Sequence, residues 1–245
     1  MKQTSGIAKN SAMLMAMNIA KMIFPLLTLP YLTRVLSTDC YGSVVYVKSV
    51  TAYLQLLVDF GFVLSATKEI VRVRHDKAAQ EKIMGDVLLA RLWLAGAALV
   101  LLVILTAALP ILRERPLLSL LSFFPVFLTL FLFDFLFRGL EKMEAIALRF
   151  VVMRGVATAL TFVLIHSDRD VLLIPLLDTL GTLIAALMVL PQLRRLGLHV
   201  RLSHDRRAAW SMLKDSAVYF ASNVASTSFS ALNTLLLGII LTTQE

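Results

Sequence analysis

The chain has 245 residues, of which 58 % are hydrophobic and 16 % charged, and its mean hydropathy is +0.81. These values exclude an ordinary soluble domain and indicate a membrane protein. The net charge of +8 would suggest nucleic acid as the partner of a soluble protein. Here the lysines and arginines cluster between apolar stretches and report on topology, so we expect no nucleic-acid partner.

Six apolar stretches and most of a seventh are long enough to cross a hydrocarbon core, which takes about 20 helical residues. They predict an all-α, polytopic membrane protein with six complete transmembrane helices and a seventh at the C-terminus. The predicted spans are 11–33, 42–66, 86–109, 117–137, 144–165, 171–191 and 216–241. We therefore expect a six-helix bundle over residues 1–191, a basic linker over 192–215, and the seventh helix within 216–245.

In the first span, polar residues recur at steps of three or seven and so share one helical face. This face carries Ser11, Asn18, Lys21, Pro25 and Thr28. Lys21 lies about ten residues, or roughly 15 Å, inside the span. A charge at that depth costs roughly 2.5–3.5 kcal/mol on insertion scales, which indicates a functional position. Pro25 predicts either a helix bent toward a cavity, as a gate element, or an ordinary kink.

The second and fourth spans also carry charged residues within apolar sequence. In the second span one face carries Lys48, Ala52, Gln55 and Asp59. Lys48 lies about 9 Å from the outer end, so it either faces the interior or snorkels to the surface. In the fourth span Asp134 and Arg138 are four residues apart, a spacing that allows a local ion pair.

The last three spans continue the pattern. Arg154 in the fifth span and Asp178 in the sixth lie at depths that would allow them to pair, and Arg154 is again about 15 Å inside its span. Asn223 leads a polar face in the seventh span. Threonines and serines on these faces are more often contacts between helices than ligands.

The linker over 192–215 is rich in arginine. Gly197 is expected to end the sixth helix, and Ser203 to cap a new one. In that helix Trp210 would lie opposite the cations, as in a helix at a cytoplasmic membrane surface. A solvated linker is the equally weighted alternative.

Together these faces predict a cavity between helices in which deep cations outnumber deep carboxylates. Such a field favours an anionic substrate such as a phosphate or pyrophosphate. The predicted substrate-binding residues are Asn18, Lys21, Lys48, Gln55, Arg154 and Asn223. The predicted charge-pairing or gating residues are Pro25, Asp59, Asp134, Arg138 and Asp178.

The distribution of lysine and arginine predicts a multi-pass protein with a cytoplasmic N-terminus and no cleaved signal peptide. Cys40 is the single cysteine, and the four histidines have no metal-ligand spacing. No paired carboxylates or nucleophile motif stands out. We therefore expect no catalytic residue, no metal and no cofactor, and a protein that is not an enzyme.

The chain resembles the N-terminal half of Wzx-type O-antigen flippases, in the polysaccharide-transporter branch of the MATE-like MOP superfamily. Four strings carry the resemblance, in order and spacing: "PLLTLPYLTRVLSTDCYG" (25–42), "YLQLLVDFGFVLSATKEIVRVR" (53–74), "FLFRGLEKM" (135–143) and "YFASNVASTSFSALNTLLLGII" (219–240). Where relatives commonly have glutamine in "FQGxEKM", this chain has Arg138, which leaves the role of that position open.

The resemblance implies the N-lobe of a two-lobed transporter that flips undecaprenyl-pyrophosphate-linked repeat units across the bacterial inner membrane by alternating access. Its implied partners are the lipid-linked oligosaccharide, membrane lipids and polysaccharide assembly proteins. Relatives are about twice as long, so we expect a fragment or truncated product, or a chain that works by association. The alternatives are a MATE-like exporter of small cations, a membrane-embedded enzyme of glycan assembly, and a degenerate lobe without transport.

Overall fold

The computed structural model describes the backbone of residues 2–242 and the side chains of residues 11–226. Within this part every regular element is a helix, and there is no strand. The elements are α1 (Lys2–Val35), α2 (Thr38–Asp59), α3 (Phe62–Arg72), α4 (Lys77–Ala108), α5 (Pro110–Glu114), α6 (Pro116–Leu121), α7 (Phe123–Leu128), the 3-10 helix η1 (Thr129–Leu132), α8 (Asp134–Gly139), α9 (Met143–Leu164), the 3-10 helix η2 (Asp168–Asp170), α10 (Leu173–Leu196) and α11 (Arg206–Thr242).

Six stretches of the described chain are long and apolar enough to cross a membrane. They are Ser11–Val35, Thr38–Arg72, Lys77–Ala108, Pro116–Gly139, Met143–Leu164 and Leu173–Leu196. The prediction of a polytopic helical membrane protein is thereby confirmed. The predicted seventh span, 216–241, falls within α11, and its side chains after residue 226 lie outside the described part.

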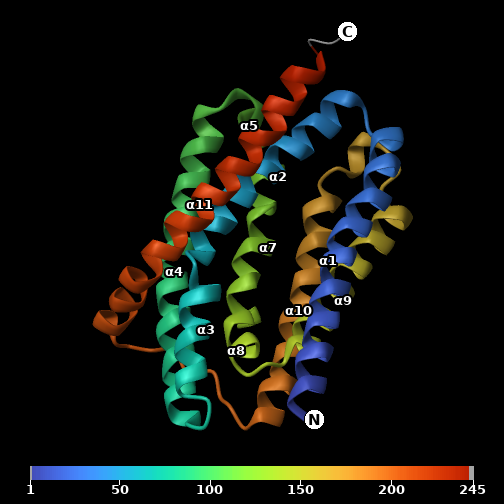
Figure 1. The fold of residues 1–245 in the computed structure, drawn as a ribbon. Helices are drawn as coiled ribbons and strands as arrows, with labels where there is room; N and C mark the ends of the chain where they lie inside the picture. Colours follow the sequence, from blue (N-terminus) through green and yellow to red (C-terminus); the bar gives the residue numbers. More distant parts are fainter. Residues whose placement is uncertain (1, 243–245) are drawn as a thin grey trace.

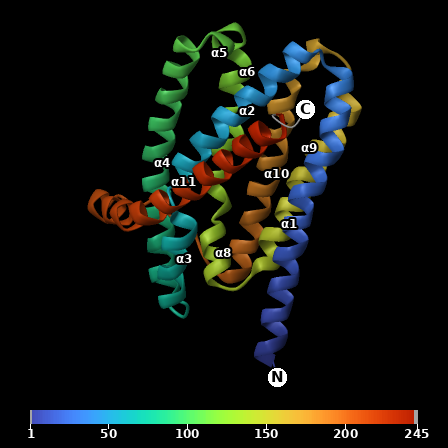
Figure 2. The ribbon, with the colours of Figure 1, turned by 45° about the horizontal axis from the view of Figure 1, so that its top comes forward.

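The helices form two groups with a broken span between them. In Figure 1, α3 and α4 lie on one side and α1, α9 and α10 on the other, while α11 begins beside α3 and α4 and runs obliquely across the bundle. The segment from α6 to α8 runs between the two groups, and the turned view in Figure 2 keeps this arrangement. The helix α1 packs mainly on α9, so most of its surface is exposed in the described structure, as expected of a lipid-facing helix.

The helix α1 continues through both Pro25 and Pro30 without a break. Proline removes one backbone donor, which leaves a carbonyl of the preceding turn free. Close to each proline a threonine hydroxyl bonds back to carbonyls of the helix: Thr28 Oγ1 donates to Phe24 O at 3.0 Å, and Thr33 Oγ1 to Leu29 O at 3.0 Å. The roles suggested for Pro25, a gate or a simple kink, stay predictions.

The second span is interrupted between α2 and α3, where the sequence predicts one helix over 42–66. Phe60 and Gly61 both adopt left-handed backbone conformations, with φ of 39° and 77°. Gly61 packs directly against α11 at Tyr219, where a Cβ would collide, and Phe60 stacks on Phe220 with ring centroids 4.5 Å apart. Contacts with α11 therefore stabilise the bend between α2 and α3.

The fourth span, predicted as a helix over 117–137, is also broken. It is divided into α6, α7, η1 and α8, and Phe133 has a left-handed backbone with φ of 47°. Pro116 and Pro125 cannot donate within the helix. In η1, arginines from other helices bind backbone carbonyls: Arg91 binds that of Thr129 and Arg149 that of Leu132.

The basic segment after α10 is shorter than predicted. The helix α10 continues past Pro191 to Leu196, and Gly197 ends it with φ of 67°, as the sequence predicts. The prediction that Ser203 caps the next helix is wrong. The carboxylate of Asp205 accepts hydrogen bonds from the backbone N–H of Arg207 and Ala208, so Asp205 fills the capping position and α11 begins at Arg206.

Candidate functional site

Three adjoining cavities lie between the two groups of helices. Their volumes are about 400, 480 and 300 Å³. Arg154 lines all three, Lys21 lines the first and second, and Gln55 lines the first and third. We call the three together the central cavity. It is bounded by α1, α2, α4, the broken fourth span, α9 and α10.

One carboxylate in the central cavity binds two cations. Asp178 on α10 has one oxygen 3.1 Å from Lys48 Nζ and the other 3.3 Å from Arg154 Nη1. We call these three residues the Asp178 cluster. The pair of Arg154 and Asp178 follows the prediction, whereas Lys48 is ion-paired toward the interior instead of snorkelling. Because one carboxylate serves two cations, the cluster keeps a net positive charge.

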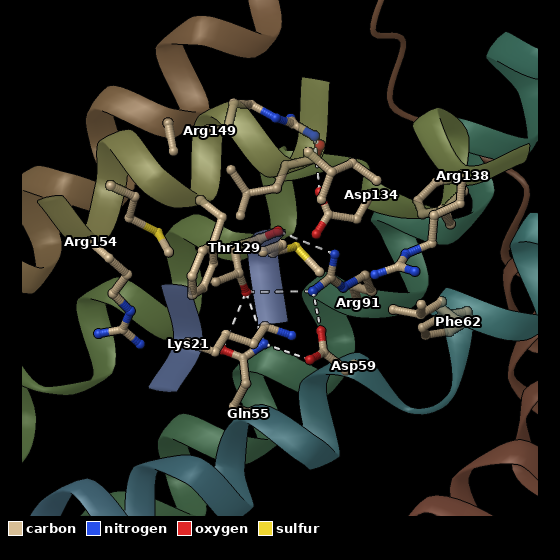
Figure 3. A pocket seen from close by; sticks show the side chains of 18 residues that line it. Lys21, Gln55, Asp59, Phe62, Arg91, Thr129, Asp134, Arg138, Arg149 and Arg154 are labelled. Atoms are coloured by element: carbon tan, nitrogen blue, oxygen red, sulfur yellow. Dashed lines mark hydrogen bonds and ion pairs between the residues drawn. The ribbon is translucent and has the colours of Figure 1, made fainter. Parts of the chain in front are cut away.

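A second cluster joins α2, α4 and η1. Arg91 on α4, with 6 % of its surface exposed, donates from Nη2 to Asp59 Oδ1 at 2.6 Å and from Nη1 to the carbonyl of Thr129 at 3.3 Å. Gln55 Nε2 donates to the other Asp59 oxygen at 2.8 Å. Figure 3 shows these side chains converging on the cavity. Arg91 therefore holds both a carboxylate and a backbone carbonyl of the broken span.

A third cluster corrects the predicted pairing of Asp134 with Arg138. Asp134 instead pairs with Arg149 on α9, whose Nη2 lies 3.0 Å from Asp134 Oδ1. Arg149 also donates to the carbonyl of Leu132 at 2.6 Å, and its guanidinium lies over the ring of Phe137. The break at Phe133 makes Asp134 the first residue of α8 and places it beside α9 (Figure 3). Asp134 and Arg138 keep their four-residue spacing on α8, but Arg149 is the residue within ion-pair distance of Asp134.

Sequence reasoning missed Arg91 and Arg149. Both are almost fully buried, at 6 % and 3 % exposure. Each is an arginine within a predicted span, which is the signal that identified Lys21 and Arg154. Neither belongs to a polar face that repeats along its helix, and their partners lie on other helices. Only the folded chain shows what they bind.

The structure brings most of the predicted site residues together. Lys21, Lys48, Gln55 and Arg154 line the central cavity, as do the predicted pairing or gating residues Pro25, Asp59, Asp134, Arg138 and Asp178. Asn18 is exposed and Asn223 half-buried, and neither is among the residues that line these three cavities. What each residue binds stays a prediction.

The charged lining of the central cavity is predominantly basic. Its carboxylates are Asp59, Asp134 and Asp178. Its cations are Lys21, Lys48, Arg91, Arg138, Arg149 and Arg154. Among the described residues, neither Lys21 nor Arg138 has a carboxylate within ion-pair distance, and Lys21 instead lies 5.7 Å from the ring centroid of Phe150. The net positive charge of this cavity, inside an apolar bundle, therefore favours the binding of an anion.

The connection before α10 ties two helix ends together on the far side of the bundle. The carboxylate of Asp168 accepts a hydrogen bond from the backbone N–H of Ser37, the residue that caps α2, at 2.8 Å. Hydrogen bonding from the side chain and backbone of Ser37 lowers the pKa of Asp168 below its ordinary value. Hydrogen bonding from the backbone of His166 and the side chain of Ser167 lowers that of Asp170. Both carboxylates are therefore structural.

No group of three or more His, Cys, Asp or Glu side chains is placed to hold a metal within the part of the chain that the structure describes. The carboxylates of the cavity instead contact lysine or arginine. What the arrangement can do chemically is bind an anion by charge and by guanidinium hydrogen bonds, which match phosphate oxygens well.

Comparison with known proteins identifies one matching family and two curated relatives. Residues 7–245 match the family described as polysaccharide biosynthesis protein. The chain is 26 % identical over 232 residues to "Putative O-antigen transporter" of Shigella dysenteriae, covering 94 % of this chain and 58 % of that protein. It is 25 % identical over 219 residues to the protein of the same name in Escherichia coli K12, covering 89 % and 52 %. The chain thus spans about half the length of these relatives. No solved structure matches it significantly.

Proposed function

The chain belongs to the polysaccharide biosynthesis protein family, and we propose that it forms part of a transporter that flips polysaccharide repeat units, linked to undecaprenyl pyrophosphate, across the bacterial inner membrane. The names of its relatives support transport over catalysis. The central cavity supports an anionic headgroup as the part of the substrate that the protein binds.

The observation that carries this proposal is the excess of cations inside an apolar bundle. Pyrophosphate brings several negative charges that would otherwise have to cross a hydrocarbon core, at high cost. The Asp178 cluster can offer Lys48 and Arg154 to the headgroup while Asp178 limits the strength of binding. A site that transports must release its substrate, so a partly neutralised cluster suits transport better than an unopposed one.

This chain supplies one wall of the proposed path. The helices α1, α2, α9 and α10 would face a second group of helices, from the remaining length of the protein or from another chain. The polyprenyl tail would stay in lipid beside the bundle, since only the phosphates and sugars need shielding from hydrocarbon. If this chain's helices and the second group separated first on one side of the membrane and then on the other, the headgroup would move across.

The experiment is replacement of Arg154 in cells whose surface glycan depends on this gene. Arg154→Ala should abolish surface glycan while the protein level stays normal, and Arg154→Lys should restore part of it. The control is Arg34→Ala, which removes an exposed cation near the end of α1. Normal surface glycan with Arg154→Ala would overturn the proposed role of the cavity.

Export of small cations fits the cavity less well. Asp59, Asp134 and Asp178 each lie within 3.3 Å of an arginine or lysine nitrogen. A cationic substrate would have to displace these side chains and then meet the remaining excess of positive charge. The basic lining therefore favours the anionic substrate.

A further inference from the structure

Arg138 on α8 lies at the far end of the central cavity from the Asp178 cluster. No described residue forms an ion pair with it. Its Nε atom is buried and has no hydrogen-bond partner in the described structure, and Arg138 is absent from every described ion pair. The side chain nevertheless lines the cavity of about 400 Å³, together with Lys21 and Arg91. Buried donors normally have a hydrogen-bond acceptor, so this guanidinium lacks a partner that the fold would be expected to supply.

Arg91 has a similar unfilled donor at the same place. Its Nη atoms are used by Asp59 and Thr129, but its Nε is buried without a partner. Arg91 is more than nine-tenths buried, so water is a poor substitute acceptor. Two arginines, each with a buried Nε that lacks an acceptor, thus line one cavity, and Figure 3 shows both side chains on the same side of it.

The nearby carboxylates are already used. Asp59 is bound by Arg91 and Gln55, and Asp134 by Arg149. Arg138 and Arg91 line the same cavity, and Figure 3 shows their side chains beside each other. Two like charges in a partly buried site repel, and an anion bound between them removes that repulsion.

We propose that Arg138 and Lys21, with the positive charge of Arg91 beside them, form a second anion subsite that binds a phosphate or pyrophosphate oxyanion through the Nη groups of Arg138 and the ammonium of Lys21. We call it the Arg138 subsite, and this proposal rests on the proposed transport function. Guanidinium groups bind phosphate oxygens with paired, charge-assisted hydrogen bonds, which supplies the missing acceptors.

The position of Lys21 gives the two sites a connection. Lys21 and Arg154 both line the cavity that contains Arg138 and the one that contains Lys48 and Asp178, and Lys21 has no carboxylate partner in the described structure. A headgroup released from Arg138 can therefore remain in contact with a cation until it reaches Lys48 and Arg154. The path would then contain two successive anion-binding sites, the Arg138 subsite and the Asp178 cluster.

The test is binding of inorganic pyrophosphate to the purified 245-residue chain in a neutral detergent at low salt, measured by titration calorimetry. Two binding events are expected for the wild type. Arg138→Gln should remove one of them, or weaken it about tenfold or more, and Arg154→Gln should affect the other. The matched control is Lys142→Gln, an exposed cation on the connection after α8, which should leave both unchanged.

A second measurement uses the unaltered protein, so it does not depend on how the variant folds. Phenylglyoxal modifies arginine side chains, and peptide mass spectrometry reports each position. Pyrophosphate should slow modification of Arg138 severalfold and leave that of Arg34 unchanged. Equal modification of Arg138 with and without pyrophosphate, or two intact binding events in Arg138→Gln, would overturn the subsite.

The outcomes separate this inference from the proposed function. Loss of binding at Arg138 alone would sustain the subsite whatever the cells show. Normal surface glycan with Arg154→Ala would refute the transport role, yet the calorimetry would still report whether the Arg138 subsite binds pyrophosphate.

Discussion

Replacement of Arg149 by Met should destabilise the bundle far more than replacement of Lys48 by Met. Arg149 is 3 % exposed and holds both Asp134 and the carbonyl of Leu132. Removing one partner of a buried pair costs about 3–5 kcal/mol, and an unsatisfied buried carbonyl about 1–3 kcal/mol. The side chain of Asp134 is 35 % exposed to the cavity. Solvent there reduces the first cost, so we expect about 3 kcal/mol in total.

For a chain of this length, about 3 kcal/mol corresponds to a fall in Tm of roughly 6–12 °C. Lys48 is 48 % exposed and shares Asp178 with Arg154, so its replacement should cost at most about 1 kcal/mol. The assay is thermal unfolding of both variants in the same detergent, followed by circular dichroism at 222 nm. Arg149→Met would be the less stable by several degrees.

A double variant sharpens the same prediction. Arg149→Met combined with Asp134→Leu leaves no unpaired charge at the position, so part of the lost stability should return. Equal unfolding temperatures for Arg149→Met and the wild type would refute the reasoning. The reasoning would also be refuted if Asp134→Leu lowered the stability of Arg149→Met by as much as it lowers that of the wild type.

Three further predictions concern backbone packing and pH. Gly85→Ala should destabilise the chain, because the added Cβ would collide with the backbone of Arg201. Gly96→Ala is the control, since an added Cβ there meets nothing within 4 Å, and Tm in detergent distinguishes the two variants. Gly61→Ala should lower Tm through both its left-handed φ of 77° and its contact with Tyr219, and an unchanged Tm would contradict the bend between α2 and α3. Because the pKa of Asp168 is lowered in the folded chain, its contribution to stability is present above about pH 4 and is lost as the pH falls through the folded value. Tm measured between pH 6 and pH 3 should therefore fall less in Asp168→Asn than in the wild type, and parallel curves would contradict the role of the Ser37 contact.

The sequence predicted those parts of the site that repeat along an unbroken helix. Lys48, Gln55 and Asp59 follow helical spacing on α2, and all three face the central cavity. Arg154 and Asp178 pair because α9 and α10 lie side by side, as consecutive spans usually do. Hydrophobicity alone was enough to predict the spans, since a helix is the only unclosed structure that satisfies its backbone in lipid.

The rest depends on contacts that no spacing encodes. Asp134 and Arg138 lie four residues apart on α8, yet Asp134 pairs with Arg149 on the next span, a contact between helices that spacing along one helix does not reveal. The partner of Arg91 lies 32 residues away, on α2. Asn18 fitted the helical face of Lys21, yet packing of α1 mainly on α9 leaves it exposed.

The broken fourth span also constrains how the chain can be assembled in the membrane. The carbonyls of Thr129 and Leu132 in this span are bound by Arg91, which is synthesised before it, and by Arg149, which is synthesised after it. A segment that leaves the translocon before α9 has no donor for Leu132 and must stay helical or remain in contact with water. We therefore expect this span to reach its final fold only after the fifth span, which carries Arg149, has been inserted.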